Sequence, residues 1–269
     1  GNSKAFLGRQ VVGEVLDTRA HRGIVSYDPT ELVITARAGT PLSELQAALD
    51  QAGQMLTCEP PHFSPDATVG GMVATGLSGP RRPWSGAVRD MVLGTRLITG
   101  FGKHLRFGGE VMKNVAGYDL SRLLAGSFGC LGVITEVSLK VLPKPRQCLS
   151  ISLEMDSDRA LLRLAEWGQQ PLPISAACHD GERLHLRLEG GEGSVAAAHD
   201  RLGGELLEQG RGVATTYRGF AEHGEFHAIG VVAKISDLFI RSRLLFAKIV
   251  GRKAKNHQTF VFVLAIKLL

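Results

Sequence analysis

The chain has 269 residues, of which 44% are hydrophobic, and a formal net charge of +5. This length and composition suit one large domain or two small ones and exclude an intrinsically disordered chain. The positive charge is concentrated at the end, because residues 234–269 carry eight basic side chains against one acidic one. The remaining body is close to neutral, so we expect no nucleic-acid partner.

The cysteines exclude two classes of metal protein. Cys58, Cys130, Cys148 and Cys178 are scattered singly, without a C-x-x-C pair. We therefore expect no structural zinc, no iron–sulfur cluster and no other metal site in this chain. Isolated thiols are typical of a reducing cytoplasm. No apolar run of about 20 residues predicts a membrane span.

The first elements in chain order are a strand and a helix. Residues 32–38 are rich in β-branched side chains and predict a strand. A helix is predicted to follow, with Thr40 as N-cap, Pro41 at the first helical position and Gly53 at its end.

Shorter elements follow as far as a proline boundary. Residues 91–99 predict a strand that ends in a glycine turn, and residues 119–124 predict a short helix. The alternation over residues 133–141 predicts another strand, which Pro143 and Pro145 end.

A second unit is predicted to begin near residue 149. Residues 149–154 predict a strand, and Ser157 is the expected cap of the next helix. Residues 174–179 and 183–189 predict a hairpin, and residues 194–207 predict a helix. The order β-α-β-β-α is most of a ferredoxin-like unit, but the sequence after Gln209 does not clearly supply the last strand.

Two glycine-rich stretches are candidates for ligand contact. Residues 67–79 (ATVGGMVATGLSG) contain small residues that allow close backbone approach, and their N–H groups are expected to form a concave nest for a pyrophosphate. The alternative is a glycine-rich turn between strands. Residues 126–136 (GSFGCLGVITE) run from a helix end into a strand, and their backbone is expected to face a planar ring system. The alternative here is a simple helix C-cap.

These stretches occur together with DMVLG (residues 90–94) and KNVAGYDL (residues 113–120). This combination resembles the vanillyl-alcohol-oxidase family of flavoproteins, whose cofactor domain is called the PCMH-type FAD-binding domain. Further blocks, among them GNSKAFLG (residues 1–8) and GPRRPWSG (residues 79–86), resemble the FAD-binding subunits of bacterial glycolate oxidases. The resemblance covers residues 1 to about 207.

The resemblance implies an α+β fold in which FAD lies between two α+β subdomains, with a small ferredoxin-like cap unit. It implies a PCMH-type domain over residues 1–146 and a partial cap, or substrate, domain over residues 147–208. The family's strand–helix–strand unit before residue 1 is absent, so we expect a missing N-terminal segment. Residues 209–269 no longer match and are expected to be a divergent, non-native basic tail. The alternative for residues 235–250 is a basic amphipathic helix at a membrane surface.

The family pattern also implies which residues bind FAD. The first pyrophosphate loop would be Gly1, Asn2, Ser3, Lys4 and Ala5. The second would be Thr68, Gly70, Gly71, Ala74 and Gly76. Gly126, Gly129, Val133 and Ile134 would line the flavin from the other side. The loops at residues 1–8 and 68–79 contain no His, Cys or Tyr, so we expect non-covalent FAD.

Catalytic residues are harder to predict. Oxidation of a hydroxy acid needs a group that takes the hydroxyl proton and a cation for the carboxylate. His62, Arg81 and Arg82 are weak candidates for these roles. The alternative for Arg81 and Arg82 is a solvated surface pair or a salt bridge to a partner subunit. Lys113 is expected to orient its loop.

The resemblance implies oxidation of a small hydroxy acid, glycolate to glyoxylate, with electrons passed to a related FAD-binding subunit and an iron–sulfur subunit. The expected location is the cytoplasm, with peripheral association at the inner membrane through the complex left open. Two alternatives remain: a non-catalytic flavin-holding subunit, and a self-sufficient flavin dehydrogenase of the D-lactate type.

Overall fold

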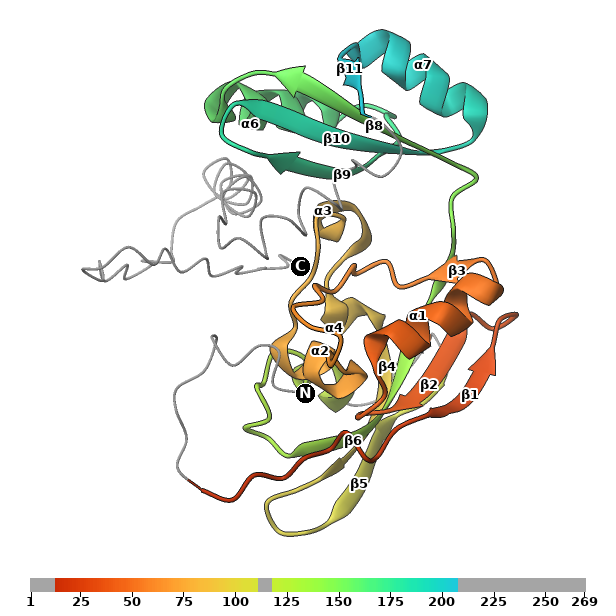
Figure 1. Cartoon of the computed structure of the whole chain (residues 1–269), viewed down its shortest axis with the longest axis vertical. Helices are drawn as coiled ribbons and strands as arrows, with labels where there is room; N and C mark the ends of the chain where they lie inside the picture. Colours follow the sequence, from red (N-terminus) through yellow and green to blue (C-terminus); the bar gives the residue numbers. More distant parts are fainter. Residues whose placement is uncertain (1–12, 111–117, 208–269) are drawn as a thin grey trace, which may run out of the picture. The chain divides into compact units, whose positions relative to one another are not determined.

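The computed structural model describes residues 13–110 and 118–207. Their contacts divide the chain into two compact units between Lys144 and Pro145 (Figure 1). Among these described residues, the helices are all too short or too polar to cross a lipid bilayer.

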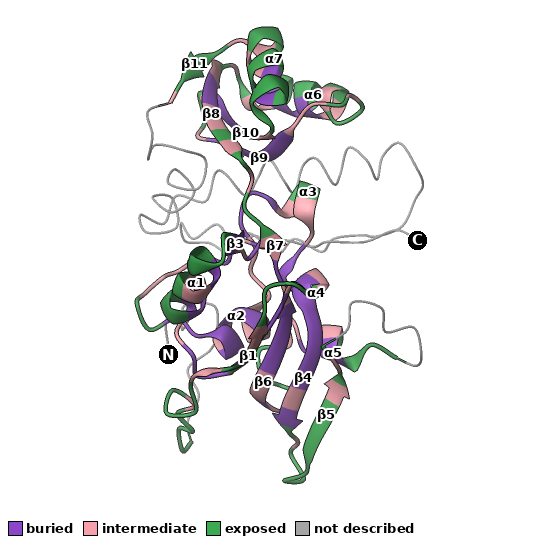
Figure 2. Cartoon of the chain, turned by 90° about the vertical axis from the view of Figure 1, so that its right-hand side faces the viewer, coloured by how far each residue is buried: buried purple, intermediate pink, exposed green. Residues whose placement is uncertain are grey.

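The first unit contains a five-stranded antiparallel sheet in the order β1-β2-β6-β4-β5. The strands are β1 (Ile24–Asp28), β2 (Val33–Arg37), β4 (Val92–Ile98), β5 (His104–Gly108) and β6 (Val133–Lys140). A separate pair is formed by β3 (Gln54–Met55) and β7 (Leu142–Pro143). The strands predicted over residues 32–38, 91–99 and 133–141 are therefore confirmed. The edge strand β5 is mostly exposed, whereas β4 is mostly buried (Figure 2).

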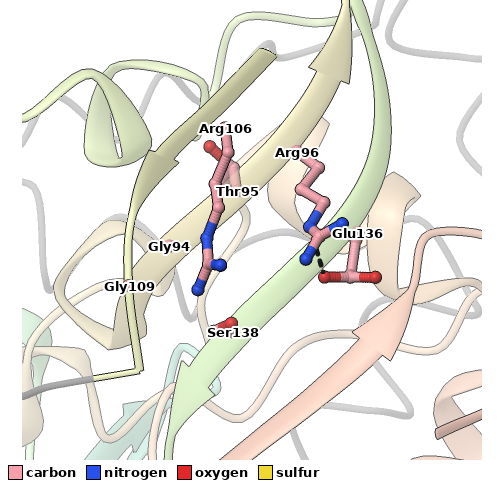
Figure 3. A pocket seen from close by; sticks show the side chains of 7 residues that line it. All are labelled: Gly94, Thr95, Arg96, Arg106, Gly109, Glu136 and Ser138. Carbon is pink, nitrogen blue, oxygen red and sulfur yellow. Dashed lines mark ion pairs between the residues drawn. The ribbon is translucent and has the colours of Figure 1, made fainter. Parts of the chain in front are cut away.

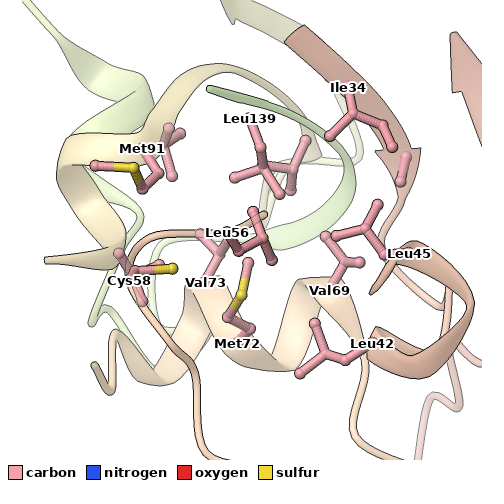
Figure 4. Close-up of a cluster of buried hydrophobic side chains, with 14 of the residues drawn as sticks. Ile34, Leu42, Leu45, Leu56, Cys58, Val69, Met72, Val73, Met91 and Leu139 are labelled. Atoms are coloured by element: carbon pink, nitrogen blue, oxygen red, sulfur yellow. The ribbon is translucent and has the colours of Figure 1, made fainter. Parts of the chain in front are cut away.

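The helices of this unit are short, apart from the first. They are α1 (Leu42–Gln51), α2 (Val69–Thr75), α3 (Arg82–Ser85), α4 (Val88–Met91) and α5 (Leu120–Leu123). Side chains from α1 and α2 pack with the sheet in one apolar core, which includes Ile34, Leu45, Met72 and Leu139 (Figure 4). Burial of this face fixes both helices on the sheet.

The predicted start of α1 is one residue wrong. Pro41 occupies the N-cap position and the helix begins at Leu42. The hydroxyl of Thr40 instead accepts a hydrogen bond from the Gly23 amide (2.9 Å) and donates to the Gly23 carbonyl (3.2 Å). This contact spans 17 residues, so local sequence rules do not reveal it.

The second unit has the ferredoxin-like topology. Its sheet has the order β11-β8-β10-β9, with β8 (Gln147–Glu154), β9 (Ile174–His179), β10 (Arg183–Gly190) and β11 (Glu205–Leu206). The helices α6 (Ser157–Trp167) and α7 (Glu192–Leu202) share one apolar cluster with Leu184, Leu186 and Leu188 of β10. The predicted hairpin of residues 174–189 is confirmed.

Two predicted boundaries in this unit are wrong. The cap of α6 is Asp156, whose carboxylate accepts from the Arg159 amide at 2.8 Å, and Ser157 is the first helical residue. The helix predicted to reach residue 207 ends at Leu202, because Gly203 and Gly204 both have positive φ. The released segment forms β11 and pairs with β8, which supplies the strand that the sequence left unassigned.

Candidate functional site

The first glycine-rich stretch forms a helix, α2, and not a turn. Thr68 is its N-cap, and the Thr68 hydroxyl accepts from the Gly71 amide at 3.1 Å. The amides of Val69 and Gly70 donate to the carbonyls of Thr40 (2.9 Å) and Ala38 (2.8 Å). All three amides thus have acceptors within the chain, and the predicted nest of available N–H groups is wrong at these positions.

The glycines of this stretch have different surroundings. A β-carbon added at Gly70 would lie 2.7 Å from the β-carbon of Ala38, so Gly70 allows α2 to pack against the end of β2. Among the described residues, a β-carbon added at Gly71 would meet only the Thr68 hydroxyl, at 3.1 Å, within a 4 Å radius. Gly71 and Ala74 are half-buried, whereas Gly70 is buried. The part of α2 available to a ligand is therefore the part that carries Gly71 and Ala74.

The second glycine-rich stretch is attached to the end of α2. The Gly126 amide donates to the carbonyl of Val73 (2.9 Å), and the Phe128 amide donates to the carbonyl of Ala74 (2.8 Å). Gly76 ends α2 with φ +64°, and a β-carbon there would lie 3.0 Å from the Gly126 nitrogen. The structure therefore brings together two stretches that are about 50 residues apart in the sequence.

The loop after this attachment has few neighbours in the described part of the chain. A β-carbon added at Gly126 or Gly129 would meet no atom of the described residues within 4 Å. Phe128, between them, has φ +53° and is 55% exposed, which is an unfavourable backbone conformation for an aromatic residue. The Ser127 hydroxyl oxygen is buried without a hydrogen-bond partner. Val133 is half-buried at the start of β6, and Ile134 belongs to the core.

The alternative of an exposed arginine pair required Arg81 to lie on the surface, but Arg81 is buried. It is 7% exposed, its amide donates to one Glu59 carboxylate oxygen (3.1 Å), and its Nε donates to the other (3.3 Å). Arg82 is half-buried at the start of α3, and burial lowers the pKa of its guanidinium. His62 lies half-buried in the segment between β3 and α2.

Other predicted residues lie outside the described part. These are the first loop, Gly1 to Ala5, together with Lys113 and the tail from residue 209. Within the described ranges, the His, Cys, Asp and Glu side chains form no group of three that would hold a metal ion.

A small pocket lies on the five-stranded sheet (Figure 3). It is lined by residues of β4, β5 and β6, among them Arg96, Arg106 and Ser138. The Nε of Arg96 lies 3.0 Å from a carboxylate oxygen of Glu136, so the charges of these two pocket residues largely neutralise each other. The pocket volume of about 10 Å³ suits one water molecule and is too small for a substrate.

The sequence reading missed a polar cluster in the second unit. Nε2 of His185 lies 2.9 Å from a carboxylate oxygen of Asp180, and both His179 and His185 are buried. The sequence of β10 contains a signal for this cluster, because Arg183, His185 and Arg187 alternate with leucines. Polar residues at alternate positions of a buried strand place a polar row on one sheet face.

Comparison with known proteins identifies an FAD binding domain and several similar proteins. Residues 1–108 match the family model of the FAD binding domain. The chain is 70% identical over 204 residues to glycolate oxidase subunit GlcE of Escherichia coli, a match covering 76% of this chain and 58% of that protein. It is 34% identical over 133 residues to glycolate oxidase subunit GlcD of Bacillus subtilis, covering 49% and 28%.

D-lactate dehydrogenases are less similar than GlcE and about as similar as this GlcD subunit. That of Anaerostipes hadrus is 36% identical over 134 residues, covering 50% of this chain and 28% of the enzyme. Among solved structures, an alkyldihydroxyacetonephosphate synthase superposes with a TM-score of 0.61 at 20% identity, covering 77% of this chain and 46% of that one, which supports the fold. The chain thus spans little more than half of its Escherichia coli relative. It has the fold of a PCMH-type FAD-binding domain, with FAD as its cofactor.

Proposed function

We propose that the chain is the FAD-binding subunit of a 2-hydroxy-acid oxidoreductase that converts glycolate to glyoxylate and passes the electrons to partner subunits. The observation that carries this proposal is the 70% identity to glycolate oxidase subunit GlcE over 76% of the chain. The match to a D-lactate dehydrogenase is weaker in identity and extends over only half of the chain. It therefore supports a self-sufficient D-lactate-type enzyme less well.

The two glycine-rich stretches fit a bound FAD. Bound FAD supplies the hydride acceptor for such an oxidation. We propose that FAD lies along Gly71 and Ala74 of α2 on one side and along Gly126, Gly129 and Val133 on the other. The remaining residues of the two predicted sets, Thr68, Gly70, Gly76 and Ile134, would hold these segments in position. Gly126 and Gly129 have room for a ligand among the residues that the structure describes, and this room and the unpartnered Ser127 hydroxyl support this placement.

The residues have separable tasks in this proposal. Gly70 has no room for a side chain and holds α2 against β2, so its contribution is to position the helix. Gly71 and Gly129 have the room for a ligand and would allow its close approach. The hydrogen bonds from Gly126 and Phe128 to α2 would keep both stretches in one fixed arrangement, so that little conformational entropy is lost on binding.

The partners follow from the proposed reaction. The chain's four single cysteines provide no cluster ligands in the usual spacing. We propose that one-electron transfer proceeds through an iron–sulfur subunit, alongside a related FAD-binding subunit. The proposed location is the cytoplasm, with peripheral attachment to the inner membrane through this complex.

A second candidate function is a flavin-holding subunit without chemistry of its own. The pairing of Arg81 with Glu59 favours it, because this arginine is then engaged within the chain. Anaerobic addition of glycolate to the FAD-loaded chain separates the candidates. Loss of the oxidised-flavin absorbance with the chain alone supports a catalytic subunit. Loss only after addition of partner subunits supports the flavin-holding role, and preference for D-lactate over glycolate contradicts the proposed substrate.

A further inference from the structure

Phe128 occupies a turn position where an aromatic side chain is unexpected. The turn ends at Cys130, whose amide donates to the Ser127 carbonyl at 3.0 Å. Its two central residues, Phe128 and Gly129, both have positive φ, +53° and +77°. Turns with positive φ at both central positions favour Asn, Asp or Gly there, because a β-carbon crowds the backbone in this conformation. The turn itself therefore does not explain a phenylalanine at its first central position.

Core packing does not explain this residue either. Phe128 is 55% exposed, and it does not belong to the apolar core that the described residues of the first unit form. An aromatic ring that stays largely in water gains little from the hydrophobic effect. Side chains that are kept in an unfavourable backbone conformation without a gain in packing are concentrated at ligand-binding sites. The exposed ring thus indicates contact with a ligand.

The loop that carries Phe128 is fixed to α2 by backbone hydrogen bonds. The Phe128 amide donates to the Ala74 carbonyl at 2.8 Å, and the Gly126 amide donates to the Val73 carbonyl at 2.9 Å. Ala74 is half-buried, on the part of α2 that we assign to FAD. The backbone of Phe128 is therefore held directly beside that part of the helix. A ring on such a fixed backbone loses little conformational entropy when it contacts a ligand.

The neighbours of Phe128 leave room for a ligand and offer it a polar group. Among the described residues, no atom lies within 4 Å of a β-carbon added at Gly126 or Gly129. The Ser127 hydroxyl oxygen is buried without a hydrogen-bond partner. FAD contains two planar aromatic systems, the isoalloxazine and the adenine, and such rings stack on the face of an aromatic side chain. The exposed ring, the room beside it and the unpaired hydroxyl fit the same cofactor.

We propose that Phe128 binds FAD by stacking its side chain on one of the two planar rings of the cofactor. The contact offsets the cost of the left-handed backbone at this residue. The glycines on either side make room for FAD, whereas Phe128 contacts it. This inference rests on the proposed function, because it names a side chain that holds the cofactor in the placement given above.

The test is a titration of the apo form of the full chain with FAD, followed by flavin fluorescence. Phe128→Tyr keeps an aromatic ring and should keep the affinity for FAD within about twofold. Phe128→Leu keeps an apolar side chain without a ring and should weaken the affinity about tenfold, because stacking is lost. Phe101→Leu is the matched control, since Phe101 is 93% exposed in the turn between β4 and β5. This variant should bind FAD as the wild type does.

Phe128→Asn separates contact with the cofactor from a role in folding. Asparagine tolerates the left-handed conformation, so the apo form of this variant should melt a few degrees above the wild type. Because it has no ring, its affinity for FAD should fall about tenfold, as in Phe128→Leu. A lower melting temperature together with weaker binding would show that Phe128 serves the fold, and it would overturn the inference.

Unchanged FAD affinity in Phe128→Leu, or no FAD binding by the wild type, also overturns the inference. Two shorter ligands identify the stacked ring, because FMN carries the isoalloxazine without adenine and ADP carries adenine without the isoalloxazine. Phe128→Leu should weaken the binding of whichever ligand contains the stacked ring. Bleaching of the FAD-loaded wild type by glycolate tests the proposed function separately. Bleaching together with unchanged affinity in Phe128→Leu would remove this inference and leave the proposed function in place.

Discussion

Gly70 and Gly193 occupy equivalent positions in the two units, because each is the second residue of its helix. Their surroundings are opposite. A β-carbon at Gly70 would lie 2.7 Å from the β-carbon of Ala38, whereas one at Gly193 would meet no atom within 4 Å in the part of the chain that the structure describes. At this helix position the first unit, referred to below as the FAD-binding unit, uses glycine to bring a helix close to the end of a strand, whereas the ferredoxin-like unit does not. A glycine count alone does not distinguish these uses.

Replacing each of the two glycines by alanine tests this comparison, and it is the test with the largest expected effect. Gly70→Ala should destabilise the FAD-binding unit by about 2–3 kcal/mol, because α2 must move away from β2. Gly193→Ala should instead stabilise the ferredoxin-like unit by about 0.5 kcal/mol, because a restricted unfolded chain loses less entropy. The chain has two tryptophans, Trp84 and Trp167, one in each unit, so urea unfolding followed by their fluorescence can report both units. Equal effects of the two substitutions would contradict the comparison.

Gly71→Val tests the difference between two neighbouring glycines of α2, Gly70 in a packing contact and Gly71 with room for a ligand. Of the described atoms, only the Thr68 hydroxyl lies near the added β-carbon, so the change in unfolding free energy should stay below about 1 kcal/mol. If FAD approaches this residue, the two added methyl groups should weaken FAD binding by tenfold or more. Flavin fluorescence titration of the apo chain measures this, with Gly193→Val as the control. Full flavin occupancy in Gly71→Val would remove Gly71 from the FAD site.

The difference between the units also explains which features the sequence predicted. In the ferredoxin-like unit, the alternation of β10 and the turn at Asp180-Gly181 are local signals, and the hairpin followed from them. Its errors were also local: Asp156 and Ser157 are both good capping residues, and the sequence does not rank them. The tandem Gly203-Gly204 was the available signal for the end of α7.

In the FAD-binding unit the important contacts are long-range. Thr68 followed by Val-Gly-Gly reads as a turn, since two glycines disfavour a helix. It becomes a helix because its amides find the carbonyls of Ala38 and Thr40. Arg81 and Glu59 are 22 residues apart, and nothing in either local sequence links them. Family resemblance located the glycine-rich stretches, but only the structure separates packing glycines from those with room for a ligand.

Asp180 gives the ferredoxin-like unit an acid sensitivity of its own. Partial burial opposes ionisation, but hydrogen bonds from His185 and from the amides of Arg183 and Glu182 outweigh it and lower the pKa of Asp180 from 3.8 to about 2. A carboxyl whose pKa is lower in the folded state stabilises the fold above pH 4, and this contribution is lost between about pH 4 and pH 2. Asp180→Asn should therefore lower the melting temperature at neutral pH, and the difference from the wild type should vanish near pH 2. A constant difference across this range would show that Asp180 acts without its charge.

The smallest expected effect concerns covalent attachment of FAD, and it again compares the two units. Burial raises the pKa of the Cys58 thiol in the first unit and of the Cys178 thiol in the second to about 12, so neither is a reactive thiolate at neutral pH. Cys130 is exposed within the second glycine-rich stretch and is the thiol best placed to reach a flavin there.

Cys130 nevertheless lies in a turn closed by its own amide, which donates to the Ser127 carbonyl at 3.0 Å, and we propose that FAD is held there by non-covalent contacts. Cys130→Ser should therefore leave FAD occupancy unchanged, and acid precipitation should release all flavin from both proteins. Flavin fluorescence that stays with the wild-type chain on a denaturing gel, and is lost in Cys130→Ser, would instead establish a thioether at this residue. Fluorescence retained by both proteins would direct peptide mapping to His62.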